Sequence, residues 1–462
     1  MKELKYDVVV VGGGPGGTPG ANMLSKNGLK VALVEKGVGL GGTCLFEGCI
    51  PSKIYIETAT RYADIKKFKN FGGILNYNDI DVDFLAIKER KDKILNARVT
   101  RAEKASKMNK LDIYYGMATI ADKNVVEVET KEEKIRLVFD KLIIATGSET
   151  VKPPIPGIEL PGIMFSEDVF ELKTKPKSMV VVGGGYIGVE IASMLARMDT
   201  KVTIIEALPR ILTTEDVAVS EAVEEGLKEY NIDIYTDAKV ASISKENDLF
   251  KVNYVKGGIE NAVSAEKVLV AVGRRPRTEN LNIELLGIKL GNHKEIPVND
   301  FMQTENPNVY ATGDVNGKIM LAHAATRESI IAAKSILGSN VPMTYNAIPH
   351  AIFCEPEAAS VGIDSSKATD LGYKVIKFSY SEDARALIVG DDKGFVQMIV
   401  DPATHKLYGM QIVGKEAGEL IMEATYIIRT NGRLEDITAS IHTHPTLSEI
   451  ITEAAEKALN LL

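Results

Sequence analysis

Short runs of apolar residues that end in glycine are the dominant pattern along the chain. One run, 8–11, leads into Gly12, and another, 179–182, leads into Gly183. Apolar runs of this length without polar alternation are typical of strands buried on both faces of a parallel sheet. Each glycine turn is followed by a helical segment and then by a second apolar run that ends in an acidic residue. The pattern predicts two units, each made of a strand, a glycine turn, a helix and a second strand.

The two units carry the same motif with the same spacing. Each contains the pattern GxGxxG, and each places a glutamate 23 residues after the first glycine. The first glycine permits a tight turn, the second lets the backbone approach a pyrophosphate, and the third lets the helix pack on the strand. The helix N-terminus attracts the diphosphate, and the glutamate accepts hydrogen bonds from ribose hydroxyls. Two dinucleotide sites are therefore expected, with Glu35 in the first and Glu206 in the second. Because a carboxylate repels a 2′-phosphate, Glu206 favours NAD over NADP.

Later apolar runs predict how the units are connected. Apolar strands that run into a glycine are expected within 141–148 and 268–274, where each unit ends, and within 309–314, beyond the second unit. The last of these implies that the first domain closes after the second has been inserted into it.

The predicted fold class is α/β, with two Rossmann-like dinucleotide-binding domains, the second inserted into the first, and a C-terminal α+β domain. Expected domain boundaries are 1–149 and 150–272 for the two dinucleotide-binding parts, 273–345 for a central part completing the first domain, and 346–462 for the C-terminal domain. Within that last domain we expect strands near 395–400 and 407–413 and helices over 416–431 and 447–461.

Length and charge narrow the class of protein. A chain of 462 residues is too long for one core, and its net charge is −8 with no basic block. Nucleic acid is therefore not an expected partner. No apolar run approaches the roughly 18 residues that span a bilayer, and the N-terminal residues enter a strand instead of forming a signal peptide. We expect no membrane partner and a cytoplasmic location.

Two cysteines stand five positions apart behind the first glycine motif. Cys44 and Cys49 lie in the segment 41–53, and the only other cysteine is Cys354. In a reducing compartment a cysteine pair is more often catalytic or metal-binding than structural. No CxxC motif or neighbouring histidine accompanies this pair, which favours a redox pair over zinc ligands. The spacing would allow a bridge across one helical turn, and Cys354 is expected to be a small buried residue.

Further motifs give the chain its resemblance to a known family. They are GGTCLFEGCIPSK at 41–53, ATGD at 311–314, MLAH at 320–323 and HTHPTLSE at 442–449. Together with the glycine motifs they resemble the flavin-dependent pyridine nucleotide–disulfide oxidoreductases, most closely the dihydrolipoamide dehydrogenases, over essentially the whole chain. The resemblance implies FAD and NAD as cofactors and a homodimer formed through the C-terminal domain. It also implies oxidation of a dihydrolipoyl group to the disulfide with reduction of NAD⁺.

Within this resemblance, the C-terminal motif contains the acid–base group. His444 would accept the proton from the dithiol and return it, and Glu449 would orient its ring. Histidine suits a proton shuttle because its unperturbed pKa is about 6.5. His442, His323 and His350 are expected to be structural, and His323 is also expected to line the cofactor.

The resemblance also assigns the cysteines and the cofactor contacts. Cys44 would exchange with the substrate, and Cys49 would lie nearer the flavin as a thiolate. Lys53 and Glu190 would form a buried pair where the cofactors meet, because buried charges persist only when paired. Both also belong to the expected cofactor contacts, and no metal ligands are expected. The remaining expected cofactor contacts are Gly12, Gly14, Pro15, Gly17, Glu35, Lys36, Gly42, Thr43, Gly116, Thr146, Gly147, Ser148, Gly183, Gly185, Tyr186, Ile187, Gly188, Glu206, Val240, Gly273, Asp314, Met320, Leu321, Ala322 and His323.

Other functions stay open. Tyr186 stands where the dehydrogenases carry an aliphatic residue, and an aromatic residue is commoner in glutathione-type reductases. The main alternative is an NAD(P)H-dependent disulfide reductase of that type, which Tyr186 supports and Glu206 opposes. A mercuric reductase is disfavoured because the C-terminus lacks a vicinal cysteine pair. A third hypothesis is a peripheral docking subunit of a multienzyme complex. The expected substrate is a small dithiol or a lipoyl protein, in the latter case from a 2-oxoacid dehydrogenase or glycine cleavage complex.

Overall fold

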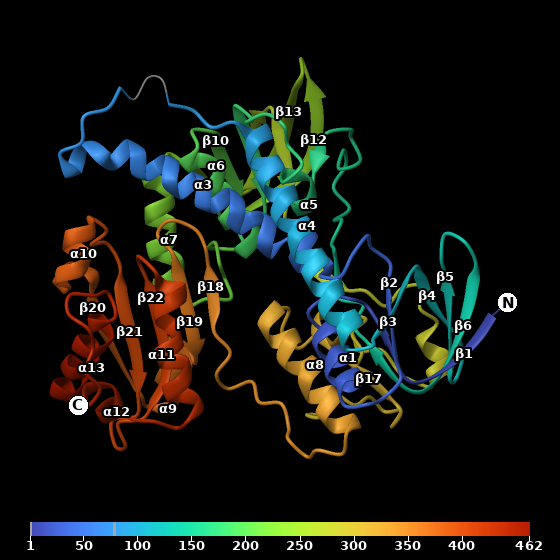
Figure 1. Cartoon of the computed structure of the whole chain (residues 1–462). Helices are drawn as coiled ribbons and strands as arrows, with labels where there is room; N and C mark the ends of the chain where they lie inside the picture. Colours follow the sequence, from blue (N-terminus) through green and yellow to red (C-terminus); the bar gives the residue numbers. More distant parts are fainter. Residues whose placement is uncertain (1, 77–79) are drawn as a thin grey trace.

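The computed structural model describes residues 2–76 and 80–462. Figure 1 shows two α/β lobes that adjoin each other and a C-terminal α+β lobe, drawn in orange and red. The N-terminus lies on the first lobe and the C-terminus on the last. Within the described residues, no helix combines the length and the apolar character that a bilayer crossing requires.

The first lobe is built on a sheet of seven strands with β1 at its centre. Val8 of β1 lies opposite Val31 of β2 and Lys141 of β6, both in parallel register. The sheet order is β3-β2-β1-β6-β5-β4, and β4 and β5 are antiparallel additions. Val8 and Val10 have no exposed surface, as expected for a strand covered on both faces. The strands of this sheet are β1 (Lys2–Val11), β2 (Val31–Glu35), β3 (Asp112–Tyr115), β4 (Met117–Asp122), β5 (Val125–Glu129), β6 (Lys134–Ile144) and β17 (Val309–Ala311).

Strand β17 confirms how the chain is threaded. It pairs in parallel with β6, with Tyr310 opposite Ile143, although the whole second lobe separates the two strands in sequence. The strand expected within 309–314 is therefore present, and the second α/β unit is inserted into the first. Helices α1 (Thr18–Lys26) and α8 (Ala322–Ile336) pack on each other in this lobe. The positions of the domain boundaries stay predictions.

The second lobe repeats the first on a smaller scale. Its parallel sheet has the order β11-β10-β9-β15-β8, and an antiparallel sheet β12-β13-β14 lies beside it. The antiparallel pair β7 and β16 lies where the chain enters and leaves the lobe. The strands are β7 (Ser148–Thr150), β8 (Ile163–Met164), β9 (Ser178–Val182), β10 (Lys201–Ile205), β11 (Asp233–Tyr235), β12 (Ala238–Glu246), β13 (Leu249–Lys256), β14 (Ile259–Ala265), β15 (Lys267–Val270) and β16 (Arg274–Pro276). The helices are α5 (Ser166–Val169), α6 (Tyr186–Arg197) and α7 (Val217–Glu229).

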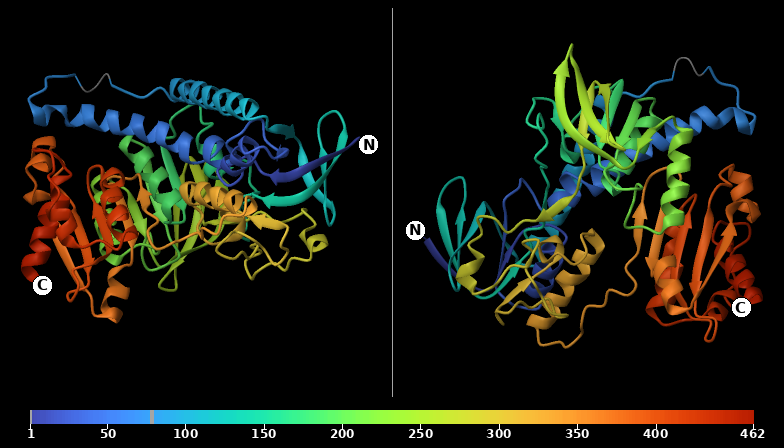
Figure 2. Two further views of the ribbon diagram at one scale, coloured as in Figure 1. Left: turned by 60° about the horizontal axis from the view of Figure 1, so that its bottom comes forward. Right: turned by 180° about the vertical axis from the view of Figure 1, so that it is seen from behind.

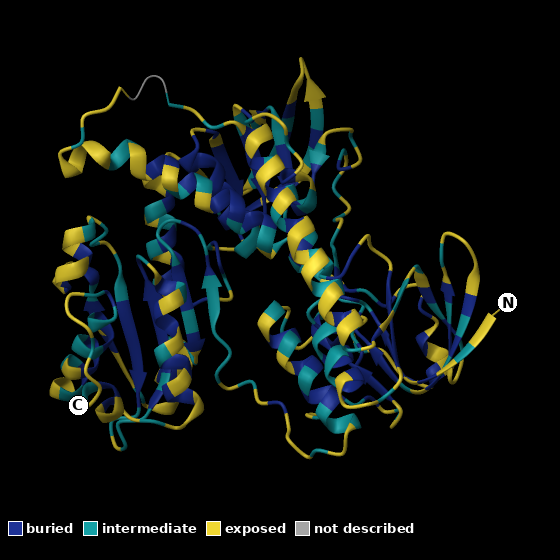
Figure 3. Cartoon of the chain, in the orientation of Figure 1, coloured by how far each residue is buried: buried dark blue, intermediate teal, exposed yellow. Residues whose placement is uncertain are grey.

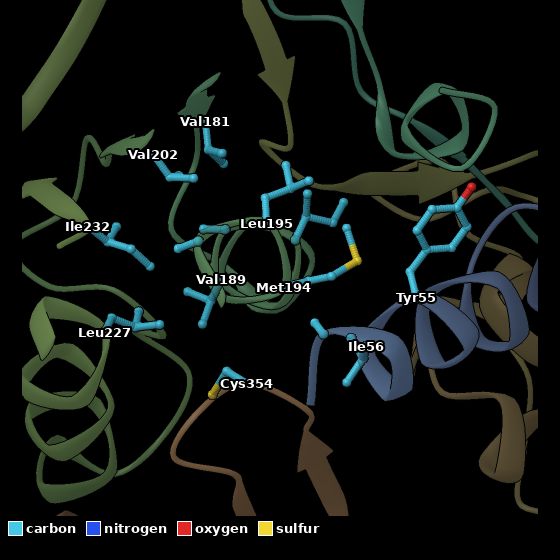
Figure 4. Close-up of a cluster of buried hydrophobic side chains, with 14 of the residues drawn as sticks. Tyr55, Ile56, Val181, Val189, Met194, Leu195, Val202, Leu227, Ile232 and Cys354 are labelled. Atoms are coloured by element: carbon cyan, nitrogen blue, oxygen red, sulfur yellow. The ribbon is translucent and has the colours of Figure 1, made fainter. Parts of the chain in front are cut away.

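Two long helices, α3 and α4, lie across the outside of the lobes (Figure 2, left), and both contribute to a core shared with α6. Tyr55 and Ile56 of α3 belong to the same buried cluster as Met194 and Leu195 of α6 (Figure 4). Cys354 is also in this cluster and is 4% exposed, which confirms its expected burial. Since α3 begins at the cysteine pair and α6 at the second glycine motif, this core holds the two motifs at a fixed separation. The helices of this region are α2 (Gly42–Phe46), α3 (Cys49–Lys67) and α4 (Phe84–Met108). Among the described residues, the short 3₁₀ helices are η1 (Phe68–Phe71), η3 (Ile283–Leu286), η4 (Gly313–Asn316) and η5 (Tyr380–Glu382).

The C-terminal lobe is an antiparallel sheet covered by helices. Its order is β18-β19-β22-β21-β20, with α11 on β19 and β22 and α13 on β20 and β21. Figure 3 shows the buried sheet between helices whose outer faces are exposed. The two predicted strands and two predicted helices are β21, β22, α11 and α13, so the α+β class is confirmed. The strands are β18 (His350–Ile352), β19 (Ala358–Gly362), β20 (Lys374–Ser379), β21 (Phe395–Val400) and β22 (Leu407–Val413), and the helices are α9 (Ser365–Leu371), α10 (Ala384–Val389), α11 (Ala417–Arg429), α12 (Leu434–Thr438) and α13 (Glu449–Leu461).

Candidate active site

One large cavity is lined by both glycine motifs. Its volume is about 1660 Å³, well above the roughly 300–1,000 Å³ of a pocket for one small ligand. The cysteine pair and the N-terminus of α6 also contribute to its wall. The cavity therefore has room for two extended ligands that meet near the cysteines.

The first glycine turn is held by backbone geometry and by its glutamate. Gly12 has φ +112°, and a Cβ there would lie 2.1 Å from the carbonyl oxygen of Ala145. The N–H groups of Gly13 and Gly37 donate to the two carboxylate oxygens of Glu35 at 2.6 and 2.7 Å. Only glycine fits at position 12, and Glu35 is fixed at the cavity wall.

The second glycine turn has the same construction. Gly184 N–H donates to Oε2 of Glu206 at 2.5 Å, and Leu208 N–H donates to Oε1 at 2.8 Å. A Cβ on Gly185 would meet no atom within 4 Å, and this glycine lines the cavity. Its backbone is thus open to a close approach by a ligand, as a pyrophosphate at the start of α6 requires. Both turns fit a dinucleotide.

The cysteines lie on two successive helices. Cys44 is in α2 and Cys49 begins α3, because the chain leaves helical geometry at Gly48 (φ −138°, ψ −102°). The expected bridge across one helical turn is therefore wrong, and the pair spans a junction instead. Both thiols are free and line the cavity. In the part of the chain that the structure describes, no cluster of three or more histidine, cysteine or carboxylate side chains could hold a metal ion.

The two thiols differ in acidity. A hydrogen bond from Cys44 lowers the pKa of the Cys49 thiol to about 7; burial opposes this shift and the charge of Lys53 supports it. The same hydrogen bond, together with burial, raises the pKa of Cys44. Near neutral pH the pair therefore holds its negative charge on Cys49.

Lys53 and Glu190 meet in the cavity wall beside the cysteines. Nζ of Lys53 donates to both carboxylate oxygens of Glu190 at 3.0 and 2.8 Å. Oε1 of Glu190 also accepts the N–H of Phe353 at 3.0 Å, and Nζ of Lys53 lies 4.3 Å from the centre of the Phe353 ring. Because Glu190 is only 9% exposed, the pair has one defined geometry and is not a loose surface contact.

A second polar group closes the first-lobe side of the cavity. Oγ of Ser148 donates to Oδ2 of Asp314 at 2.6 Å, and Nε of Arg274 donates to the same Oγ at 2.8 Å. Asp314 lines the cavity, and this chain of contacts fixes its carboxylate there.

Most expected cofactor contacts line the cavity, and three do not. A Cβ on Gly17 would lie 1.9 Å from the carbonyl oxygen of Gly12, so Gly17 serves helix packing; Gly188 has the same relation to Gly183 at 2.1 Å. His323 is turned toward the carbonyl oxygen of Pro349, 2.9 Å from its Nε2. The expected residues that do line the cavity are Gly12, Gly14, Pro15, Glu35, Lys36, Gly42, Thr43, Lys53, Gly116, Thr146, Gly147, Ser148, Gly183, Gly185, Tyr186, Ile187, Glu190, Glu206, Val240, Gly273, Asp314, Met320, Leu321 and Ala322.

His444 and Glu449 bond to each other away from this cavity. Nδ1 of His444 lies 2.9 Å from Oε1 of Glu449, whose Oε2 accepts the N–H of Thr446 at 2.8 Å. These two contacts, the backbone one first, lower the pKa of Glu449. The His444 side chain is 75% exposed, and neither residue belongs to the lining of the cavity in its own chain. His442, in contrast, is tied to Glu423 at 3.1 Å.

Comparison with known proteins decides the family. Residues 6–329 match the pyridine nucleotide-disulphide oxidoreductases, and residues 348–455 match the dimerisation domain of the same group. The chain belongs to the pyridine nucleotide-disulphide oxidoreductase family. It is similar to dihydrolipoyl dehydrogenase of Geobacillus stearothermophilus, with 37% identity over 99% of this chain and 97% of that protein. The corresponding Staphylococcus aureus protein is 36% identical over the same shares of the two chains.

Among solved structures, the chain is similar to the HOCl-induced flavoprotein disulfide reductase RclA from Escherichia coli in its Cu(II) complex. The TM-score is 0.89 at 28% identity, and the match covers 98% of this chain and 99% of that one. As a pyridine nucleotide-disulphide oxidoreductase, the protein is an enzyme that uses FAD and NAD(H). A subunit that only docks does not fit this membership.

The cavity of this enzyme also contains residues that the sequence did not predict. His350 was expected to be structural, yet it lines the cavity together with Thr214. Arg277 lies near Lys36, whose pKa is lowered by burial and by the charge of Arg277. The basic run at 274–277, directly after Gly273, could have signalled Arg277. No local pattern marks His350, because it reaches the cavity only through the docking of the C-terminal lobe.

Proposed function

We propose that this enzyme oxidises a dihydrolipoyl group to its disulfide and reduces NAD⁺ to NADH. The observation that carries the proposal is the meeting of the cysteine pair with both glycine turns on one cavity. The near full-length similarity to dihydrolipoyl dehydrogenases supports the choice of substrate. The substrate's carrier would be a lipoyl protein from another chain, of a 2-oxoacid dehydrogenase or glycine cleavage complex.

Thiol–disulfide exchange would bring the electrons into the enzyme. A thiolate of the substrate attacks Sγ of Cys44 in the oxidised pair, and the Cys44–Cys49 bond breaks as the new sulfur–sulfur bond forms. The second substrate thiolate then attacks the substrate sulfur bound to Cys44, which closes the substrate disulfide and leaves Cys44 reduced. Two electrons have then moved from the substrate to the cysteine pair. Cys49 suits the leaving position because thiols of low pKa leave faster.

The residues around the cavity would hold the two cofactors. Glu35 and Asp314 would bind the ribose and ribityl hydroxyls of FAD, and Glu206 the ribose of NAD. When bound, FAD supplies the two-electron relay between the cysteine pair and NAD⁺. Lys53, fixed by Glu190, would place a positive charge beside the flavin and favour its negatively charged reduced form.

The proton would be handled across a subunit interface. His444 is exposed and bonded to Glu449, as a base with an orienting partner requires. The same lobe exposes the large apolar side chains of Met422, Tyr426 and Ile441, which a second copy of the chain would cover. We therefore assign proton transfer at each cysteine pair to His444 of the partner subunit.

A second candidate is reduction of a disulfide substrate by a nicotinamide nucleotide. The similarity to RclA, described as a flavoprotein disulfide reductase, favours it, as does the aromatic residue at Tyr186. The same cysteines and the same cavity would serve this reaction in reverse.

The two candidates are separated by one steady-state comparison on the purified enzyme. We expect kcat/KM for dihydrolipoamide with NAD⁺ to exceed that for glutathione disulfide with NADPH by at least about a hundredfold, because a site built for one substrate discriminates through its transition state. Higher efficiency with glutathione disulfide would instead assign the enzyme to the reductases.

The preference for NAD should depend on Glu206. Its carboxylate is fixed by two backbone N–H groups and cannot move away from a 2′-phosphate. We expect the wild type to prefer NAD⁺ over NADP⁺, and Glu206→Gln to reduce the preference in kcat/KM by about tenfold, the effect of removing one nearby charge. Glu221→Gln, on the exposed side of α7, is the matched control and should leave the preference unchanged. An unchanged preference in Glu206→Gln would show that another group reads this position.

A further inference from the structure

Tyr186 is tethered at the cavity wall by a buried carboxylate. Its hydroxyl donates to Oε1 of Glu215 and accepts a hydrogen bond from Oγ1 of Thr214 at 2.9 Å. Glu215 is 5% exposed and lies just before α7, 29 positions away in sequence. Tyr186 is therefore fixed at its backbone, by helix α6, and at its hydroxyl, by these hydrogen bonds.

Glu215 is in turn anchored to the C-terminal lobe. Ser360 of β19 donates to its Oε2, and Nδ1 of His350 on β18 lies 3.5 Å from its Oε1. The neighbouring Asp216 accepts the N–H of Ser365 at 2.7 Å. Figure 2 (right) shows α7, which begins directly after these two acids, beside the sheet of that lobe. Tyr186 is thus positioned by the junction of the second and third lobes.

The charge at this junction resides on Glu215. Burial opposes ionisation of Glu215, but hydrogen bonds from His350, Ser360 and Tyr186 outweigh it and lower the pKa of the carboxyl. Burial and the charge of Glu215 raise the pKa of Tyr186. Near neutral pH the pair is a carboxylate and a neutral phenol, and Tyr186 keeps its proton.

The position of Tyr186 relative to the other motifs indicates which part of NAD it would face. It opens α6 directly after the glycine turn and lies one helical turn before Glu190, which holds Lys53. Glu206, the expected ribose ligand, is at the other side of the same turn, bonded to Gly184. A dinucleotide with its diphosphate on the turn would bring its nicotinamide to the side of Tyr186, Thr214 and His350.

We propose that Glu215 is a positioning residue for nicotinamide. It fixes the ring of Tyr186, and its negative charge favours the cationic oxidised nicotinamide over the neutral reduced one. The charge of Lys53 is held by Glu190, whereas Glu215 is bonded to two titratable side chains among the described residues, Tyr186 and His350. The site would therefore bind NAD⁺ and release NADH. The inference rests on the proposed function and adds a reason for its direction.

The test compares two ligands that cannot reduce or oxidise the flavin in the oxidised holoenzyme. They are NAD⁺ and the tetrahydro analogue of NADH, which has an uncharged ring and gives no hydride; isothermal titration calorimetry measures both Kd values. In Glu215→Gln we expect the Kd of NAD⁺ to rise about tenfold relative to that of the analogue, which corresponds to about 1.4 kcal/mol. In Tyr186→Phe, which keeps the charge, we expect both Kd values to rise by a similar factor. Glu221→Gln on α7 removes the same kind of side chain from an exposed position and should change neither.

Each alternative outcome has a distinct meaning. Equal weakening of both ligands in Glu215→Gln, or no weakening of either, would overturn the role of its charge. Wild-type binding of both ligands by Tyr186→Phe would overturn the positioning role, and this variant decides the matter if Glu215→Gln does not retain FAD. If the wild type binds neither ligand, the proposed NAD-dependent function itself fails.

Discussion

The Cys49→Ser variant is expected to lose catalytic oxidation of dihydrolipoamide by at least about a thousandfold, the scale seen when a nucleophile is removed. It should also lack a spectroscopic signature of the wild type. In the reduced wild type a thiolate at Cys49, next to a bound flavin, should produce a long-wavelength thiolate-to-flavin absorption band. The low pKa of Cys49 makes it the charged member of the pair.

Cys44→Ser is the matched control, and pH provides a second check. It should also be inactive in turnover, but its remaining Cys49 thiolate should show the band without added dithiol. The pKa of Cys49 is lowered to about 7, so the wild-type band should be present above that pH and lost as the pH falls below it. Persistence of the band in reduced Cys49→Ser would show that another group is the thiolate beside the flavin.

His444→Ala is expected to reduce kcat by roughly 10²–10⁴-fold, the usual contribution of a general acid–base. More informative is a heterodimer of His444→Ala and Cys49→Ser chains, each inactive as a homodimer. If His444 serves the partner's cysteines, one site combines intact cysteines with an intact histidine and the other carries both lesions. About half of the wild-type activity should return in the purified heterodimer, for independent sites.

The result of the heterodimer experiment depends only on which chain supplies the histidine. If His444 served its own chain, each site would keep one lesion and no activity would return. A verified heterodimer without activity would therefore contradict the arrangement across the interface.

The glycine turns and their glutamates were predictable because the whole construction is local. Gly12 and Glu35 lie within 23 positions, and the bonds between Glu35 and Gly13 form inside one strand–turn–helix–strand unit. The third glycines show the limit of the motif. Gly17 and Gly188 were expected among the cofactor contacts, but they do not reach the cavity and serve the helix packing that the motif assigns to its third glycine.

Some contacts between lobes were predictable only through the family resemblance, and others were not predictable at all. The Lys53–Glu190 pair joins residues 137 positions apart, and only the resemblance suggested it. The bond from Ser360 to Glu215 spans 145 positions and depends on how the C-terminal lobe docks. Nothing near either residue marks it in sequence.

Several missed elements of the C-terminal lobe are very short. Strand β18 has three residues and helix α12 has five, too few for a periodic pattern to appear. Strand β20 has six residues, as many as β21, but its lysines interrupt the apolar run. The more strongly apolar strands β21 and β22 and the amphipathic helices α11 and α13 were predictable.

The central claim is that electrons pass from a dihydrolipoyl group through the cysteine pair to NAD⁺. It is tested most directly by two successive anaerobic additions to the oxidised holoenzyme, followed by rapid-scan absorption. One equivalent of dihydrolipoamide should generate the long-wavelength band, and excess NAD⁺ should then remove it and form about one equivalent of NADH per active site. An enzyme that dihydrolipoamide does not reduce, or whose reduced form yields no NADH on addition of NAD⁺, would contradict the account.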